Sequence, residues 1–149
     1  MMTDPRTLAA YLYLHRGEAM PAPVLDAEGE LDVAADDAAI TAWSQVRDPF
    51  TVDMARLSLF IVRTEGLLIN LQQLELDPAQ PVSPQYMAVF YDAAKSVFDN
   101  DAAQLRTYFS WLYLVLFQRD EGPRWGDFVE ILGVDEFVSL TRARFAQLI

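Results

Sequence analysis

The sequence contains no cysteine and only one histidine, His15. The lack of cysteine excludes disulfide bonds, thiolate metal sites and a cysteine nucleophile. A single histidine excludes a metal site built from several histidines. The six glycines are scattered, so the chain has no glycine-rich phosphate loop, and it has no G-x-S-x-G nucleophile elbow. We therefore expect a protein that is not an enzyme and that holds no cofactor or metal.

Basic residues are scarce as well. Ten arginines and one lysine, Lys95, stand against 22 acidic residues, and the formal net charge is −11. The imbalance is greatest between Arg16 and Arg47, where seven acidic residues and no basic residue occur. Because negative charge repels phosphate groups, this composition opposes non-specific binding to nucleic acid or anionic membranes. A local group of arginines remains compatible with a specific RNA contact.

Long hydrophobic runs are also absent. The longest is Tyr108–Phe117, ten residues interrupted by Ser110, whereas a helix that crosses a bilayer needs about 20 apolar residues. Asp4 and Pro5 occupy the place where a secretion signal has a basic start and then an apolar segment. We expect a cytoplasmic protein without membrane contact.

The chain is nevertheless rich in core-forming residues. Hydrophobic residues make up 52% and aromatic residues 12% of its 149 residues, which is enough for one packed domain over 1–149. Apolar residues repeat at helical spacing, and no alternating strand pattern competes with them. We predict an all-α fold, a compact bundle of about five main helices plus one or two short ones. The expected helices are 4–15, 33–46, 52–76, 84–98, 101–118, 126–132 and a last one from about 135.

Polar and special residues mark several helix ends. Asp4 is suited to cap the first helix. Ser83 and Pro84, at the end of a proline-rich connector over 77–84, are suited to the cap and first position of the fourth. Gly133 is suited to end the sixth helix in a left-handed conformation.

The third expected helix is hydrophobic on most of its circumference, which is typical of a central, largely buried helix. Gly66 interrupts its interior. Glycine costs about 1 kcal/mol relative to alanine at such a position, unless a neighbouring helix must approach closely there.

Residues 18–30 hold two prolines, a glycine and four acids, so we expect an exposed acidic loop over 17–31. The candidate contacts to a basic partner are Asp26, Glu28, Glu30 and Asp32. A helix–loop–helix calcium site needs glycine at the sixth position of its loop and glutamate at the twelfth. In a loop that begins at Asp26, those positions hold Leu31 and Asp37. We therefore expect a solvated loop or a loop that meets a basic partner.

One stretch carries a more specific pattern. Residues 104–133 read QLRTYFSWLYLVLFQRDEGPRWGDFVEILG. The segment resembles the end of the helical anticodon-binding region of class I lysyl-tRNA synthetases, in which such a helix precedes a glycine-proline-arginine turn. A looser similarity runs from about 91 to 136. The matching residues are Leu105, Arg106, Phe109, Leu112, Tyr113, Leu116, Gly122, Pro123, Arg124, Gly126, Phe128 and Gly133.

The sequence also departs from that family. Gln118 stands where the family usually has a glycine, and one histidine with one lysine cannot supply the family's nucleotide-binding motifs. The resemblance therefore implies a helical fold of that type, without the catalytic core.

The same resemblance allows RNA contact through Arg106, Arg119 and Arg124, and Trp125 is a further candidate contact to RNA or a partner. An alternative is that the turn only connects two helices. Arg124 would then bind helix-end carbonyls or pair with Asp120, Glu121 or Asp127.

These patterns lead to three hypotheses of function. The first is a non-enzymatic adaptor or assembly module that presents a helical surface to a protein partner or to a second copy of itself. The second is a tRNA- or RNA-binding module that uses the synthetase-like segment. The third is an acidic mimic of nucleic acid that occupies a nucleic-acid-binding protein.

Overall fold

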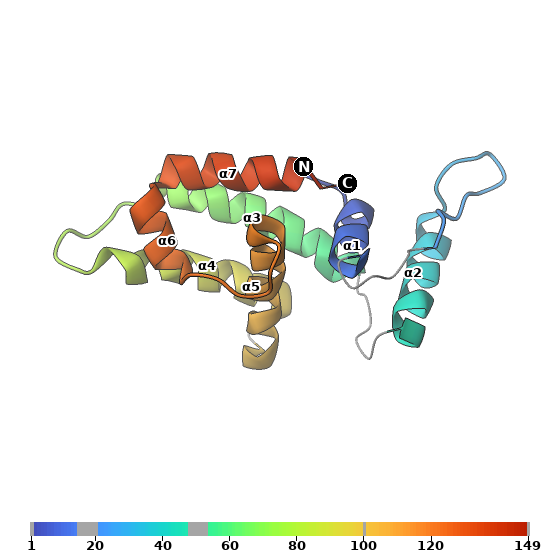
Figure 1. The fold of residues 1–149 in the computed structure, drawn as a ribbon, viewed down its shortest axis with the longest axis horizontal. Coiled ribbons are helices and arrows are strands. Elements are labelled where there is room, and N and C mark those ends of the chain that lie inside the picture. Colours follow the sequence, from blue (N-terminus) through green and yellow to red (C-terminus); the bar gives the residue numbers. More distant parts are fainter. Residues whose placement is uncertain (1, 15–20, 48–53, 100, 149) are drawn as a thin grey trace.

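The computed structural model describes residues 2–14, 21–47, 54–99 and 101–148. Over these residues the chain forms seven helices and no named strand, which confirms the predicted all-α fold (Figure 1). None of these helices is both long and apolar enough to cross a membrane. The helices are α1 (Pro5–Leu14), α2 (Val33–Arg47), α3 (Met54–Gln73), α4 (Val82–Phe98), α5 (Ala102–Phe117), α6 (Trp125–Leu132) and α7 (Val134–Ala146).

Helix α1 begins as its sequence predicts. The carboxylate of Asp4 accepts hydrogen bonds from the Thr7 backbone N–H at 2.8 Å and from the Thr7 hydroxyl at 2.6 Å. These bonds satisfy donors that the first helical turn leaves unpaired. Leu8 is buried against the core, and the Tyr11 hydroxyl donates to the backbone oxygen of Leu114 at 2.7 Å. His15, expected to end this helix, lies outside the described residues.

Helix α3 lies at the centre of the bundle and packs on α1, α4 and α7. Its buried residues form one continuous face: Met54, Leu57, Phe60, Ile61, Thr64, Leu67, Leu68 and Leu71. The predicted central position is confirmed, but burial is less complete than its composition indicates. Val62 and Ile69 are 49% and 46% exposed on the opposite face.

The connector between α3 and α4 ends earlier than predicted. Helix α4 begins at Val82 after Pro81, and no side chain caps it, so the expected Ser83–Pro84 cap is wrong. The Ser83 hydroxyl instead donates to the Asp127 carboxylate at 2.5 Å. Gln85 instead ties the connector to α4, because its side-chain amide accepts from the Asp77 N–H and donates to the Pro81 backbone oxygen.

An aromatic cluster joins α4, α5, α6 and α7. The Trp125 ring stacks on Tyr113 with 4.4 Å between centroids and on Phe90 with 5.5 Å. Phe128 and Phe137 meet the same indole edge-on. Rings at these separations gain attraction beyond their buried area, so this cluster is a principal anchor of the fold.

A polar contact also lies inside the core. The hydroxyls of Thr64 on α3 and Tyr108 on α5 hydrogen-bond at 2.8 Å. Both side chains are fully buried, and burial raises the pKa of Tyr108 far above its usual range. The pair therefore holds α3 and α5 in a fixed register without introducing charge.

The second region of the molecule is the arm, residues 21–47, which consists of a short hairpin and α2. It projects at one end of the bundle beyond α1, whereas α6 lies towards the other end (Figure 1). Leu25 and Leu31 form an isolated antiparallel bridge in the hairpin. Both leucines remain exposed, at 57% and 44%.

Candidate functional site

The turn between α5 and α6 is built by backbone conformation. Helix α5 ends at Phe117, and Gln118 adopts a left-handed conformation with φ of 60°. Its N–H donates to the Leu114 oxygen at 3.0 Å, as in a left-handed helix cap. Glycine is the residue best suited to this conformation, and this is the position where the sequence departs from the synthetase pattern.

Gly122 in the turn and Gly126 at the start of α6 allow close packing. A Cβ atom on Gly122 would lie 2.8 Å from Cδ1 of Tyr113. A Cβ atom on Gly126 would lie 2.3 Å from the backbone oxygen of Ser83, so α6 could not sit this close to α4 with any other residue there. The Gly126 N–H donates to the sulfur of Met87 at 3.0 Å. Both glycines thus have a packing reason that requires no ligand.

Tyr113 links the helix to the turn. Its hydroxyl donates to the backbone oxygen of Pro123 at 2.6 Å, while its ring lies on Trp125. Partial burial raises the pKa of the Tyr113 phenol. The turn is therefore held by a neutral hydrogen bond and by ring stacking, which fixes the position of the intervening Arg124.

An open groove lies beside this turn, between α4, α5 and the start of α6. Its volume is about 310 Å³. Arg106 and Arg124 line it together with the rings of Tyr91, Phe109 and Tyr113. The remaining lining residues are Met87, Ser110, Asp120 and Trp125. We call this feature the arginine groove.

The three predicted arginines are all exposed. The structure brings Arg106 and Arg124 to the arginine groove, whereas Arg119 is not among its lining residues. In the described part of the chain, no hydrogen bond or ion pair joins Arg124 to a helix-end carbonyl or to Asp120. The two groove arginines are thus available to a ligand.

Trp125 requires a correction. Its side chain is 1% exposed, so it supports the groove from below and offers almost no surface to RNA or a partner. Its indole Nε1 is buried without a hydrogen-bond partner in the described chain. Tyr91, which sequence reasoning missed, is 42% exposed and packs edge-on against Phe109 at 5.6 Å. No local pattern marks it, because the groove joins α4 to residues far along the chain.

The acidic segment is more ordered than predicted. The Asp26 N–H donates to the Glu30 oxygen at 2.8 Å, and the Asp32 N–H donates to the Val24 oxygen at 2.9 Å. Gly29, with φ of 78°, makes the turn between them. For residues 21–31 the predicted exposed loop is confirmed, and it is closed into a short hairpin by these bonds and by the isolated Leu25–Leu31 bridge. Residues 17–20 lie outside the described residues.

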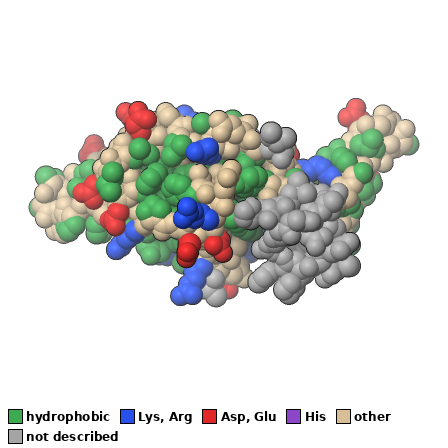
Figure 2. Space-filling model, in the orientation of Figure 1, with side chains coloured by type: hydrophobic (Ala, Val, Ile, Leu, Met, Phe, Trp, Pro, Cys, Tyr) green, Lys and Arg blue, Asp and Glu red, His purple; other side chains and the backbone are tan. Residues whose placement is uncertain are grey.

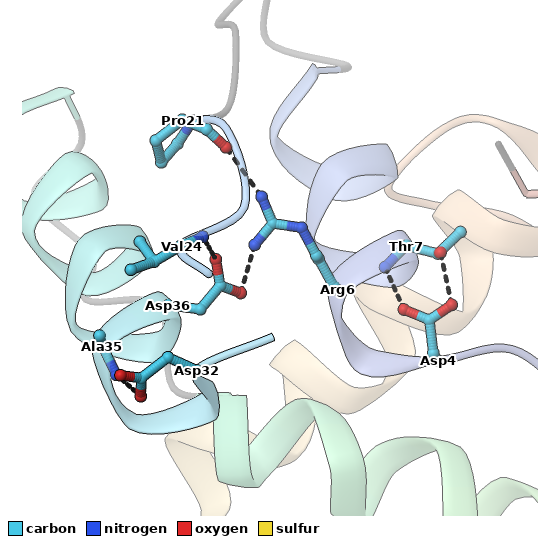
Figure 3. A network of polar contacts seen from close by, with 8 residues as sticks. All are labelled: Asp4, Arg6, Thr7, Pro21, Val24, Asp32, Ala35 and Asp36. Atoms are coloured by element: carbon cyan, nitrogen blue, oxygen red, sulfur yellow. Dashed lines mark hydrogen bonds and ion pairs between the residues drawn. The ribbon is translucent and has the colours of Figure 1, made fainter. Parts of the chain in front are cut away.

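The four predicted acids divide into two pairs. The Asp26 carboxylate accepts from the N–H groups of Glu28 and Glu30. The Asp32 carboxylate accepts from the Ala35 N–H at the start of α2 (Figure 3). These two aspartates shape the hairpin and cap the helix. Glu28 and Glu30 are exposed. The tip of the arm thus combines acidic and hydrophobic side chains, as the space-filling view shows (Figure 2).

One ion pair fastens the arm to the bundle. The Arg6 guanidinium on α1 pairs with the Asp36 carboxylate on α2 and also donates to the Pro21 oxygen at 2.8 Å (Figure 3). Asp36 also accepts from the Val24 N–H at 3.1 Å, and its side chain is only 3% exposed. Sequence reasoning missed this contact, because no local pattern relates residues 30 positions apart.

The described residues hold no group of three or more histidine, aspartate or glutamate side chains able to bind a metal ion together. The protein is an all-α helical bundle, and its arginine groove combines aromatic rings with two exposed arginines. Comparisons with known protein families, curated proteins and solved structures find no match to this chain. The synthetase resemblance therefore remains a prediction from the sequence.

Proposed function

We propose that this protein is a non-enzymatic interaction module that binds an acidic segment of a partner protein in the arginine groove. The observation that carries the proposal is that Arg106 and Arg124 line one groove beside exposed and half-buried aromatic rings. In the described chain, neither guanidinium forms an ion pair with a carboxylate. In a chain with a net charge of −11, two exposed arginines that form no ion pair in the described chain are unusual, and they can bind an anionic ligand.

The chemistry of the groove favours carboxylates together with apolar groups. A guanidinium donates two parallel hydrogen bonds to one carboxylate, and such charge-assisted bonds are stronger than neutral ones. Tyr91 and Phe109 offer ring surface within the same groove. Tyrosine and arginine are also the residues that dominate binding energy at protein interfaces. An acidic peptide with interspersed hydrophobic residues meets both requirements.

RNA binding through the same arginines is the competing interpretation. Base-stacking platforms need exposed ring faces beside a basic groove. Here Trp125 is buried, and Asp120 lies in the same groove as the two arginines. The carboxylate and the global negative charge oppose a phosphate backbone and an acidic peptide alike. The buried indole leaves less ring surface for base stacking, so we favour the peptide.

The acidic-mimic interpretation has less support from the arm. A mimic needs a row of free negative charges, but Asp26 and Asp32 use their carboxylates inside the hairpin and at the start of α2. Glu28 and Glu30 are the remaining candidates. Changing both to glutamine removes the charge and retains the hairpin contacts, so it tests this interpretation without disturbing the fold.

The proposal is tested with a fluorescently labelled peptide that alternates glutamate with leucine and phenylalanine. Fluorescence anisotropy should show saturable binding to the full-length protein. Arg106→Ala and Arg124→Ala should each weaken binding about tenfold or more, since each removes a charge-assisted hydrogen bond. Arg142→Ala, an exposed arginine on α7 away from the groove, is the matched control and should bind normally.

Two further measurements separate the interpretations. A peptide with glutamine in place of every glutamate should bind far more weakly if the carboxylates matter. Bulk tRNA at about 50 mM salt, where electrostatic binding is strongest, should show no saturable binding. Peptide affinity that is indifferent to both arginine substitutions, or tRNA binding that Arg124→Ala abolishes, would reject the peptide proposal.

A further inference from the structure

The exposed face of α3 is a second surface, distinct from the arginine groove. Five residues on this face follow the alternating three-and-four spacing by which helices pair. Val62, Ile69 and Gln73 are exposed, and Leu59 and Gly66 are half-buried. We call Leu59, Val62, Gly66, Ile69 and Gln73 the α3 stripe.

Gly66 is the unusual member of this stripe. Glycine is unfavourable in a helix interior, and it is tolerated where another backbone must come close. A Cβ atom built on Gly66 meets no described atom within 4 Å, whereas Gly122 in the α5–α6 turn and Gly126 in α6 are tightly packed. Nothing in the part of the chain that the structure describes therefore explains the missing side chain. A helix from outside the chain would explain it.

Charge indicates what kind of helix that is. Helix α3 contains one carboxylate, Glu65, and this group accepts a hydrogen bond from the Met2 N–H at 2.7 Å. The polar residues flanking the stripe towards its C-terminal end are the amides Asn70 and Gln72. Amides carry both donors and acceptors, so they can pair with the same groups of another copy. In a protein of net charge −11, this face allows two copies to meet with little carboxylate repulsion.

We propose that two copies of this protein pair through their α3 stripes, with the helices antiparallel and crossing at Gly66. In a two-fold interface each surface meets itself, so residues equally far from Gly66 in opposite directions face each other. Arg63, three residues before Gly66, then faces Ile69 of the second copy, and Val62, four residues before Gly66, faces Asn70 of the second copy. Val62 and Ile69 cover the crossing point on both sides.

This pairing goes beyond the proposed function and does not depend on it. The stripe lies on α3, whereas the groove lies between α4, α5 and α6. A dimer of this kind carries two arginine grooves, so it can hold two acidic segments at once. Binding of both at one assembly would raise the apparent affinity for a bivalent partner.

The experiment measures the mass of the full-length protein by light scattering during size-exclusion chromatography at high micromolar concentration. The unmodified protein should have twice the chain mass of 16.9 kDa. Gly66→Ala and Ile69→Glu should each yield the single-chain mass. The matched control is Ile131→Glu, which makes the same change at a residue of α6 that is 87% exposed, and it should remain dimeric.

Thermal unfolding distinguishes a lost interface from a damaged fold. At dilutions where both proteins are monomeric, Gly66→Ala should raise the melting temperature by roughly 2–4 °C, because alanine favours the helix. The substitution thus stabilises the monomer while it abolishes the dimer. A monomeric unmodified protein, or a dimer that survives Gly66→Ala or dissociates in Ile131→Glu, would overturn the proposal. Normal peptide binding by Gly66→Ala would leave the groove proposal intact.

Discussion

The bundle and the arm are stabilised by different kinds of contact. In the bundle, α1 and α3–α7 share a core in which aromatic rings such as Phe60, Phe90 and Trp125 are fully buried. In the arm, a hairpin closed by backbone hydrogen bonds leaves Leu25 and Leu31 exposed. Its described connection to α1 is the polar network around Arg6 and Asp36 (Figure 3). The bundle depends on buried area, whereas the arm buries one described apolar side chain of α2 completely, Ile40, and otherwise depends on a few directed polar contacts.

This difference predicts two levels of stability in one chain. Contacts that bury large rings contribute to global unfolding, whereas a segment held by few contacts opens locally at a lower free-energy cost. We therefore expect the arm to separate from α1 at a lower free-energy cost than the unfolding of the bundle. A partner that binds the arm would change its position while leaving the arginine groove in place.

The largest expected effect comes from Trp125→Ala in the bundle. It removes the indole that stacks on Tyr113 and Phe90 and leaves a cavity among α4, α5 and α7. Truncating a buried aromatic ring of this size typically costs about 3–5 kcal/mol. We expect the free energy of unfolding, measured by urea titration followed by circular dichroism, to fall by about 4 kcal/mol.

Trp125→Phe is the matched control for that loss. Phenylalanine retains an aromatic ring, and the buried Nε1 has no hydrogen-bond partner in the described chain to lose. Its cost should therefore be less than half that of alanine. Equal losses for the two substitutions would show that ring stacking is not the source of the stability.

The next effect should be confined to the arm. Arg6→Ala leaves the Asp36 carboxylate buried without its cation, and breaking such a pair typically costs about 3 kcal/mol. We expect hydrogen exchange to accelerate in the amides of α2 and of the hairpin. Exchange in α4 and α7 should change much less, because those helices pack within the bundle.

A second substitution sharpens this test. In Arg6→Ala with Asp36→Ala, no unpaired charge is buried, so part of the lost protection in α2 should return. The recovery should be incomplete, because Val24 also loses its bond to Asp36. Uniform acceleration of exchange across the bundle and the arm would show that the two regions unfold together and do not differ in stability.

The sequence predicts the helices well because local signals define them. The spacing of apolar residues places all seven, and the Asp4 cap is confirmed. Gly133 ends α6 with a positive φ of 94°, but its ψ of 147° lies outside the predicted left-handed helical conformation. Local signals fail where tertiary contacts decide. Ser83 reads as a cap, yet Gln85 binds the connector and Ser83 binds Asp127 across the bundle. The hairpin at 21–31 is also missed, because its order depends on the Asp26 turn.

The candidate site is predicted only in part, for the same reason. The arginines at 106 and 124 are marked by the synthetase-like pattern, and the structure brings both to one groove. Tyr91 comes from α4, and only the packing of α4 on α5 places it there. Tryptophan is common both at interfaces and in cores, and the sequence does not show which of the two applies to Trp125. The structure shows that Trp125 is a core residue.

The smallest expected effect is a gain in the bundle alone. Gln118 holds a left-handed conformation that costs a residue with a Cβ atom about 1 kcal/mol, whereas glycine adopts it freely. Gln118→Gly should therefore raise the free energy of unfolding by up to about 1 kcal/mol, and Gln118→Ala, which keeps the Cβ atom, should not. Because the arm opens locally, hydrogen exchange in α2 should be the same in both variants. A destabilising Gln118→Gly would mean that the Gln118 side chain makes a contact that outweighs its backbone strain.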